Sequence, residues 1–237
     1  MGNSETIYAQ MSTLAKYVNS NICLVTIKNS MKPVNKKSII INDIEIHLRS
    51  PNNIDNQPRW SDLDEEYRFL IASLRKIDEK DTLMNPVLIG PDFTGKTALA
   101  IAAANECKLP IYISYCTSDM HPEDLIIIPV MSKDYKIIYH ASALVSAMIN
   151  GGVCVLVEAN RMNEKSWVSL APLLDDRRYV ESIIAGVKIK ADPEFRLVAT
   201  MTEDASTDNL PGYIESRLKP VIRIKSPKIL PTIHWKC

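Results

Sequence analysis

The sequence lacks the features that mark membrane, secreted and metal-binding proteins. Its 237 residues contain no run of about 18 apolar residues, and the N-terminus has no basic segment followed by an apolar one. The five cysteines include no C-x-x-C pair, and the four histidines do not form an H-E-x-x-H pattern. We therefore expect a soluble, cytoplasmic protein with no membrane span, reduced cysteines and no structural metal.

The chain also lacks net charge. Its 28 basic residues balance its 28 acidic residues, so the protein as a whole has no field that would attract nucleic acid or acidic lipid. Hydrophobic residues make up 46% and charged residues 24% of the chain, which is the composition of an ordinary globular protein with a buried core. The length predicts one substantial domain with an appendage rather than a series of small modules.

The chain divides into three parts. Residues 1–60 are predicted to form an N-terminal appendage, because Asn-rich polar stretches interrupt two short β-branched runs, Ile22–Ile27 and Ser38–Ile46. An Asn-Asp pair inside the second run predicts a hairpin there. Residues 61–226 form the expected core, and residues 227–237 form a tail in which two prolines exclude a helical domain.

The core is predicted to be an α/β fold. Five short apolar runs separated by helical segments predict a five-stranded, mainly parallel sheet with helices on both faces. The expected strands are Pro86–Gly90, Leu109–Cys116, Val153–Val157, Phe195–Met201 and Val221–Ile224. The expected helices lie within Ser61–Asp78, from Lys96 onward, around Ser142–Ile149 and around Glu164–Leu174. Two insertions, Leu125–Tyr139 and Tyr179–Lys190, each predict a β-hairpin.

One motif in the core carries recognisable chemistry. The run Gly90-Pro91-Asp92-Phe93-Thr94-Gly95-Lys96-Thr97 fits G-x-x-x-x-G-K-[ST], and it lies between a predicted strand and the apolar helix Ala98–Ala104. In this context the N–H groups of the loop and the positive end of the helix dipole form a cradle for phosphate oxygens. Lys96 would supply a charge to the β- and γ-phosphates, and Thr97 would supply a hydroxyl to Mg²⁺. All eight loop residues are therefore candidate nucleotide-binding residues, with ATP and Mg²⁺ as the expected cofactors.

Further stretches, in a fixed order, resemble the MoxR-like, dynein-related group of AAA+ ATPases. The resemblance extends from about Ser61 to Ser226 and therefore covers most of the chain. Pro122–Leu125 resembles the start of the family's helix-2 insertion, and Gly151–Arg161 resembles its Walker B strand with the segment that follows. Tyr179–Lys190 is placed like the family's pre-sensor-1 hairpin, and Ala199–Met201 resembles its sensor-1 strand. Leu210–Leu218 resembles the short helix whose arginine reaches a neighbouring subunit.

The resemblance implies a P-loop NTPase core of the AAA+ type that assembles, as a homo- or hetero-oligomer, into a hexameric ring with ATP or ADP at the subunit interfaces. ATP hydrolysis would drive the remodelling of a partner protein, which no motif in the sequence identifies. By resemblance, Glu158 is the catalytic base, Thr202 stands at the sensor-1 position, and Arg217 is the finger that completes the neighbouring subunit's site. An arginine supplied in this way stabilises the charge that develops in phosphoryl transfer.

Three departures from the family pattern predict slow or absent hydrolysis. The family's Walker B strand ends in Asp-Glu, whereas this chain has Val157-Glu158 and so lacks the aspartate that holds the metal. A register shifted by one residue would exchange the two roles but would misplace Asn160 and Arg161. Sensor 1 carries Thr202 in place of asparagine, and a hydroxyl has a shorter reach than an amide. The family's helical lid is also missing after the fifth strand, so the chain is either a fragment or a protein without a lid.

Other functions stay open at this point. One alternative is a non-catalytic interaction subunit, in which bound nucleotide only orders the core. The changed Walker B and sensor-1 residues favour this alternative. The sequence therefore does not decide whether the protein hydrolyses ATP. A P-loop kinase or nucleotide transferase would need an acceptor site and a lid, and the sequence shows neither. Nucleic-acid binding would use four hairpin lysines, but such lysines usually form a solvated face, and the zero net charge argues against it. These lysines are Lys133, Lys136, Lys188 and Lys190.

Overall fold

The computed structural model describes residues 36–54, 63–75, 83–204 and 210–225. Three predictions from the sequence lie outside these ranges: the run Ile22–Ile27, both ends of the first expected helix, and the tail 227–237. None of the helices in the described ranges has both the length and the hydrophobicity that a membrane crossing requires.

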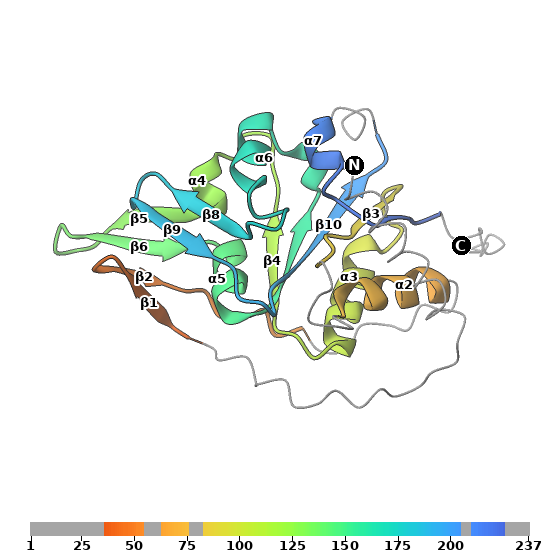
Figure 1. Ribbon diagram of the computed structural model, residues 1–237, viewed down its shortest axis with the longest axis horizontal. Helices are drawn as coiled ribbons and strands as arrows, with labels where there is room; N and C mark the ends of the chain where they lie inside the picture. Colours follow the sequence, from red (N-terminus) through yellow and green to blue (C-terminus); the bar gives the residue numbers. More distant parts are fainter. Residues whose placement is uncertain (1–35, 55–62, 76–82, 205–209, 226–237) are drawn as a thin grey trace, which may run out of the picture.

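Five parallel strands form the central sheet, in the order β11-β3-β10-β7-β4 (Figure 1). This confirms the expected strands, and every neighbouring pair in the sheet is parallel. Strand β10 comes fourth along the chain but lies at the centre of the sheet, where it pairs with β3 on one side and β7 on the other. The strands are β3 (Val87–Gly90), β4 (Ile111–Tyr115), β7 (Val153–Val157), β10 (Arg196–Thr202) and β11 (Val221–Arg223).

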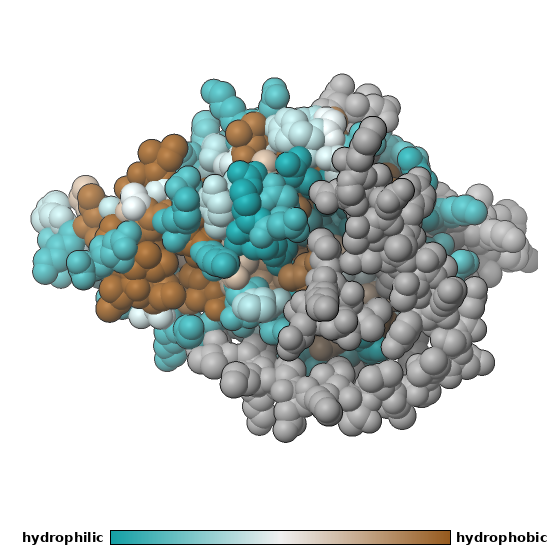
Figure 2. All heavy atoms as spheres, viewed as in Figure 1, coloured by the Kyte–Doolittle hydropathy of each residue, from teal (hydrophilic) through white to brown (hydrophobic). Residues whose placement is uncertain are grey.

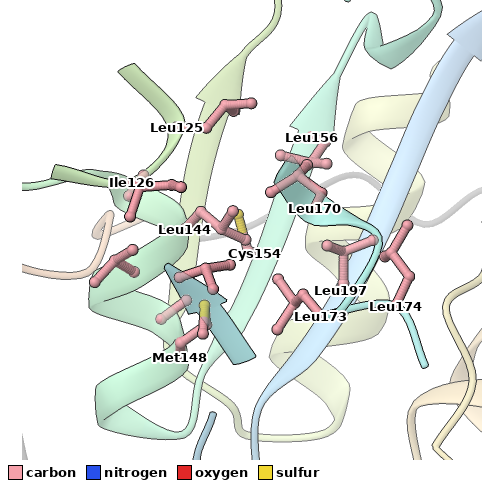
Figure 3. Close-up of a cluster of buried hydrophobic side chains, with 14 of the residues drawn as sticks. Leu125, Ile126, Leu144, Met148, Cys154, Leu156, Leu170, Leu173, Leu174 and Leu197 are labelled. Carbon is pink, nitrogen blue, oxygen red and sulfur yellow. The ribbon is translucent and has the colours of Figure 1, made fainter. Parts of the chain in front are cut away.

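Helices cover both faces of this sheet because successive strand residues point to opposite sides. On β7, Val153 and Val155 pack in an apolar cluster with residues of α2 and α3, whereas Cys154 and Leu156 pack in a second cluster with residues of α5 and α6. Figure 3 shows part of this second cluster. The burial on both faces confirms the predicted α/β architecture. The helices are α2 (Asp64–Leu74), α3 (Lys96–Glu106), α5 (Ala143–Asn150) and α6 (Glu164–Leu170).

Helix α6 is shorter than the sequence predicts. Its start is well defined, because the Asn163 side chain accepts a hydrogen bond from the backbone N–H of Ser166 at 3.0 Å. The expected end at Leu174 is wrong, because the regular helix stops at Leu170. Pro172 has no N–H to continue the series of hydrogen bonds, so the chain goes on in turns.

Both predicted insertion hairpins are present, and each consists of two antiparallel strands. In the second hairpin, Lys188 forms a 3.3 Å ion pair with Glu181, and its Nζ lies 4.4 Å from the centre of the Tyr179 ring. This lysine is therefore engaged within its own hairpin. The first hairpin follows α4 (Pro122–Leu125) and contains β5 (Ile127–Met131) and β6 (Ile137–Ala141), and the second contains β8 (Tyr179–Ser182) and β9 (Val187–Lys190).

A third hairpin, near the start of the described chain, joins the first insertion in one sheet. Strands β1 (Ser38–Ile41) and β2 (Ile44–His47) are antiparallel, and Asn42 and Asp43 form their turn with φ values of 49° and 63°. The sequence predicts this hairpin but does not predict that it pairs with another strand. Strand β2 pairs with β6 in parallel, which gives a four-stranded sheet in the order β1-β2-β6-β5.

This four-stranded sheet projects from one end of the molecule (Figure 1). It is tied to the core, because Ile46 is fully buried and the backbone N–H of Arg49 donates to Ser146 Oγ of α5 at 2.9 Å. Part of its surface is apolar, and Figure 2 shows hydrophobic side chains gathered at this end beside polar ones. The exposed large hydrophobic residues of the sheet are Ile40, Val130, Met131, Tyr135 and Ile137.

Candidate functional site

The phosphate-binding motif joins the end of β3 to the start of α3. Gly90 is the last residue of β3, and Gly95 directly precedes Lys96, the first residue of α3. Gly95 has a φ of 83°, a conformation that residues with a Cβ rarely adopt. Gly90 is needed for a different reason, because a Cβ there would overlap the carbonyl oxygen of Ile224. Both glycines are therefore required by the backbone of the loop.

The Lys96 side chain is turned into the loop. It is only 6% exposed, and its Nζ donates to the carbonyl oxygens of Gly90 at 2.9 Å and Pro91 at 2.7 Å. The hydroxyl of Thr94 donates to the same Pro91 carbonyl at 2.9 Å. The loop is therefore closed around its own lysine, and charged phosphate oxygens would be stronger acceptors for that amine than the two carbonyls.

The start of α3 offers backbone donors beside this lysine. No side chain caps the helix, and no acidic residue stands in its first turn. The first N–H groups of a helix have no partner within it and carry the positive end of its dipole, which makes this end a site for anions. Thr97, the predicted Mg²⁺ ligand, lies in this turn and is partly exposed.

Phe93 differs from the other loop residues. Its φ is 60°, and its side chain is fully exposed to solvent. A positive φ strains the backbone of an aromatic residue, and a side chain in solvent gains no packing to offset this cost. The loop conformation at this position would suit a glycine.

Three of the predicted site residues meet beside the loop. Thr202 ends β10 and is paired in register with Gly90. Glu158 follows β7 in a left-handed conformation, with a φ of 57°. The Thr202 hydroxyl oxygen lies 3.0 and 2.9 Å from the two carboxylate oxygens of Glu158 and 3.0 Å from Oδ1 of Asp92. The structure thus brings together Asp92, Glu158 and Thr202 from three separate segments.

The 3₁₀ turn η2 (Ala159–Arg161) supports this cluster. The Asn160 side-chain oxygen accepts a hydrogen bond from the backbone N–H of Thr202 at 3.3 Å, and Arg161 Nε lies 3.5 Å from a Glu158 oxygen. Val157 is buried in the apolar cluster that includes α3. Of the Val157-Glu158 pair, Glu158 is therefore the member that reaches Thr202.

A buried cysteine lies near Glu158. The backbone N–H of Cys116 donates to the Val157 carbonyl at 2.8 Å, and burial, helped by the negative charge of Glu158, raises the pKa of the Cys116 thiol to about 12. This thiol is therefore neutral at physiological pH and is not a nucleophile. The three cysteines in the described ranges, Cys107, Cys116 and Cys154, are all free thiols.

Arg217 lies apart from the cluster, just after α7 (Gly212–Glu215). Its Nε is 3.3 Å from an Asp175 oxygen, and its Nη1 donates to the Tyr213 carbonyl. Asp175 also accepts hydrogen bonds from Arg177 at 3.0 and 2.9 Å, and these bonds, foremost those of Arg177, lower the pKa of Asp175. Within the described residues, Arg217 makes no hydrogen bond or ion pair with the phosphate-binding loop or with the Thr202 cluster.

Two side-chain arrangements could not be found from the sequence. The sequence marks Asp92 only as one residue of the phosphate-binding loop. In the structure its carboxylate contacts Thr202, which lies 110 positions later in the sequence. An acidic residue inside a loop that binds anions is the one signal that points to it. Asp175 stands 42 positions from Arg217, and no local pattern marks the pair.

The oxygen atoms at this site suit Mg²⁺. Mg²⁺ prefers oxygen ligands, keeps several waters, and is commonly held by one or two carboxylates together with substrate phosphates. The first turn of α3 provides the Thr97 hydroxyl, and the cluster beside the loop provides the Glu158 carboxylate. The chemistry of these donors fits the metal even though Val157 contributes no oxygen.

Comparison with known families gives a match over most of the described chain. The family model of the AAA domain (dynein-related subfamily) matches residues 85–218, which is more than half of the chain. The matched segment contains the phosphate-binding loop, Glu158, Thr202 and Arg217.

Several curated proteins are similar to this chain. The denitrification regulatory protein NirQ of Pseudomonas aeruginosa is 31% identical over 141 residues, which cover 58% of this chain and 51% of the relative. Protein NorQ of Paracoccus denitrificans is 33% identical over 141 residues, covering 58% and 49%. NirQ of Stutzerimonas stutzeri is 34% identical over 129 residues, covering 54% and 44%. The chain spans about half the length of the curated relatives it matches.

The family match, the similar proteins, the parallel sheet and the phosphate-binding loop together confirm the resemblance to MoxR-like AAA+ ATPases: the chain belongs to the dynein-related subfamily of AAA domains.

Proposed function

We propose that this chain binds ATP or ADP together with Mg²⁺ and acts as a slow ATPase subunit of a ring. The observation that carries the proposal is the buried amine of Lys96, held inside the loop by two carbonyl oxygens next to the Glu158–Thr202 pair. In P-loop NTPases this lysine and the loop backbone cradle the β- and γ-phosphates, and a nearby residue positions the attacking water.

Each residue of the site then has a defined task. Lys96 exchanges its bonds to the Gly90 and Pro91 carbonyls for bonds to phosphate oxygens, while the free N–H groups of α3 bind the same phosphates. Thr97 would help to hold Mg²⁺, and the ion would neutralise part of the phosphate charge. Glu158 accepts a proton from the attacking water, and the Thr202 hydroxyl orients the Glu158 carboxylate.

Slow hydrolysis is supported by two features of this site. Val157 is buried in the core, so β7 supplies no aspartate to the metal. At the sensor-1 position, the Thr202 hydroxyl lies within hydrogen-bonding distance of the Glu158 and Asp92 carboxylates, and a hydroxyl has a shorter reach than the amide of an asparagine. We expect turnover below about 1 s⁻¹, at the lower end of the usual range for enzymes.

Assembly into a ring is supported by the position of Arg217. Its side chain is partly exposed and contacts Asp175 and Tyr213 rather than the phosphate-binding loop of its own chain. This is the arrangement expected of an arginine that acts on the nucleotide of a neighbouring subunit, in a homo- or hetero-oligomer. The names of the NirQ relatives describe regulatory proteins. We propose that this chain likewise acts in the cytoplasm on a partner protein.

The test is phosphate release from Mg²⁺–ATP by the purified protein over a range of protein concentrations. The proposal expects slow release that rises more than linearly with protein concentration and disappears in Lys96→Ala and Glu158→Gln. Lys165→Ala, which removes an exposed lysine of α6, serves as the control and should release phosphate like the wild type. Release faster than about 1 s⁻¹, or release that survives Lys96→Ala, would contradict the proposal.

A second candidate is a non-catalytic interaction subunit in which nucleotide is a structural ligand. The burial of Val157 and the engaged hydroxyl of Thr202 favour it. This candidate predicts that nucleotide raises the melting temperature of the protein without any phosphate release, because a ligand that binds only the folded state stabilises it by mass action.

A further inference from the structure

We propose that Asp92 is a specificity-determining residue that makes the site of the single chain bind a nucleoside diphosphate more tightly than the triphosphate. The inference rests on the proposed function, because it requires that the loop binds nucleotide. It starts from the position of the Asp92 carboxylate, which lies between the loop and the Glu158–Thr202 pair.

The arrangement of the site indicates in which direction the phosphates of a bound nucleotide would run. Lys96 and the start of α3 form the inner part of the cradle. Strands β3, β10 and β7 are neighbours in the sheet, and their ends place Gly90, Thr202 and Glu158 along one adjoining wall. A carboxylate that takes a proton from the attacking water has to lie beside the phosphate under attack. The terminal phosphate of a triphosphate therefore lies toward this wall, beyond the part of the cradle that a diphosphate needs.

Asp92 reaches into the same space from the loop. Its Oδ1 is 3.0 Å from the Thr202 hydroxyl oxygen, which also lies 3.0 and 2.9 Å from the Glu158 oxygens. A threonine hydroxyl has one proton, so it donates to one of the two carboxylates at a time. The two carboxylates are therefore no more than two hydrogen-bond lengths apart, with a single donor proton between them.

The two carboxylates differ in how their charge is balanced. Glu158 has a basic neighbour, since Arg161 Nε lies 3.5 Å away. In the described part of the chain, no basic side chain comes within ion-pair distance of Asp92. The charge of Asp92 therefore faces the incoming terminal phosphate with no basic side chain to balance it, and like charges repel each other.

The repulsion acts mainly on the terminal phosphate. The other phosphates bind on the side of Lys96 and the α3 N-terminus, where the charge is positive. A triphosphate must also displace Asp92 from Thr202, whereas a diphosphate leaves that contact in place. We expect the diphosphate to bind about tenfold more tightly, the difference that a modest electrostatic penalty produces.

The test is calorimetric titration of the purified chain with ADP and with the slowly hydrolysed analogue ATPγS, each in excess Mg²⁺. The variants are Asp92→Asn, which keeps the shape of the side chain, and Asp92→Gly, which removes it. The matched control is Asp134→Asn, which makes the same change of charge on the exposed turn of the β5–β6 hairpin. Circular dichroism of each variant checks that it is folded.

The expected result is tighter binding of ADP than of ATPγS by the wild type, and a preference reduced at least about fivefold in both Asp92 variants through tighter binding of ATPγS. Asp134→Asn should retain the wild-type preference. Equal binding of both nucleotides by the wild type, or a preference unchanged in the Asp92 variants, would overturn this inference alone. Failure of the folded wild type and of all variants to bind either nucleotide would instead refute the proposed function.

Discussion

Arg217 Nε lies 3.3 Å from Asp175 Oδ2, which ties the segment after α7 to the loop that follows α6. Asp175 also accepts two hydrogen bonds from Arg177. One carboxylate therefore holds two arginines, and the arginine that we propose to act on a neighbouring subunit is fixed in place within its own chain before any assembly.

The Asp175 contacts predict a defined dependence of stability on pH. The hydrogen bonds lower the pKa of Asp175 below its ordinary value of 3.8, so its stabilising effect is complete above that pH and is lost as the pH falls through the lowered pKa. We expect Asp175→Asn to lower the free energy of unfolding at pH 7 by about 1 kcal/mol, the scale of partly exposed ion pairs. Urea unfolding at pH 7 and at pH 3 measures this difference, which should shrink at the lower pH.

The control for this prediction is Asp176→Asn. Asp176 is exposed and makes no ion pair with any residue that the structure describes. Its loss should leave the free energy of unfolding unchanged at both pH values. A difference between wild type and Asp175→Asn that grows on acidification would show that the assigned sign is wrong.

Lys96→Ala is expected to abolish stabilisation by nucleotide. The amine donates into the loop at 2.9 and 2.7 Å, and without it the cradle has no charge to offer phosphate oxygens. A ligand present at 100 times its dissociation constant stabilises a protein by about 2.7 kcal/mol, which corresponds to a rise in melting temperature of roughly 5–10 °C for a domain of this size. Thermal unfolding with and without ADP and Mg²⁺ should show this rise in the wild type and in Lys165→Ala, but not in Lys96→Ala.

Gly90→Ala is expected to destabilise the protein by about 1–3 kcal/mol, the usual cost of forcing an atom into a packed site. The added Cβ would overlap the backbone of Ile224, which cannot move as a side chain can. Gly212→Ala is the matched control, because no atom lies within 4 Å of the added Cβ. Urea unfolding should place this control within about 0.5 kcal/mol of the wild type. Equal stabilities of the two variants would mean that β3 and the residue after β11 are less tightly apposed than the structure shows.

The thiol of Cys116 is expected to resist alkylation in the folded protein. Its pKa of about 12 leaves only about one thiol in ten thousand ionised at pH 8, and the thiolate is the reactive form. Treatment with iodoacetamide, followed by mass spectrometry of the peptide that contains Cys116, should find it unmodified in native protein and modified in urea. Rapid labelling of the native protein at pH 8 would contradict the burial that raises the pKa.

The positions of the core strands could be predicted because their signals are local. Val153–Val157 is continuously apolar, as a strand buried on both faces must be, and all five of its residues are buried. The partner of β2 could not be predicted, because the Ile46–Tyr139 pairing joins segments that are far apart in the sequence. Nothing in a β-branched run specifies which distant strand will complete its hydrogen bonds.

The same distinction holds in the candidate site. The phosphate-binding loop is contiguous, so its residue types and spacing predict both the glycine conformations and the inward lysine. The contacts of Thr202 with Asp92 and Glu158 depend on the ends of three strands being placed side by side. Family resemblance indicated Glu158 and Thr202 one by one, whereas the approach of Asp92 follows only from the folded geometry.

The central position of β10 has a consequence for the order of folding during synthesis. Strands β4 and β7 are neighbours in the sheet, so they can pair as soon as both have left the ribosome. Strand β3, which leads into the phosphate-binding loop, has β10 and β11 as its neighbours in the described sheet, and both are made later. Until β10 emerges, the apolar residues and backbone groups of β3 have no strand to pair with, a state that favours aggregation. The nascent chain therefore carries its future nucleotide loop on an unpaired strand until β10 has been made.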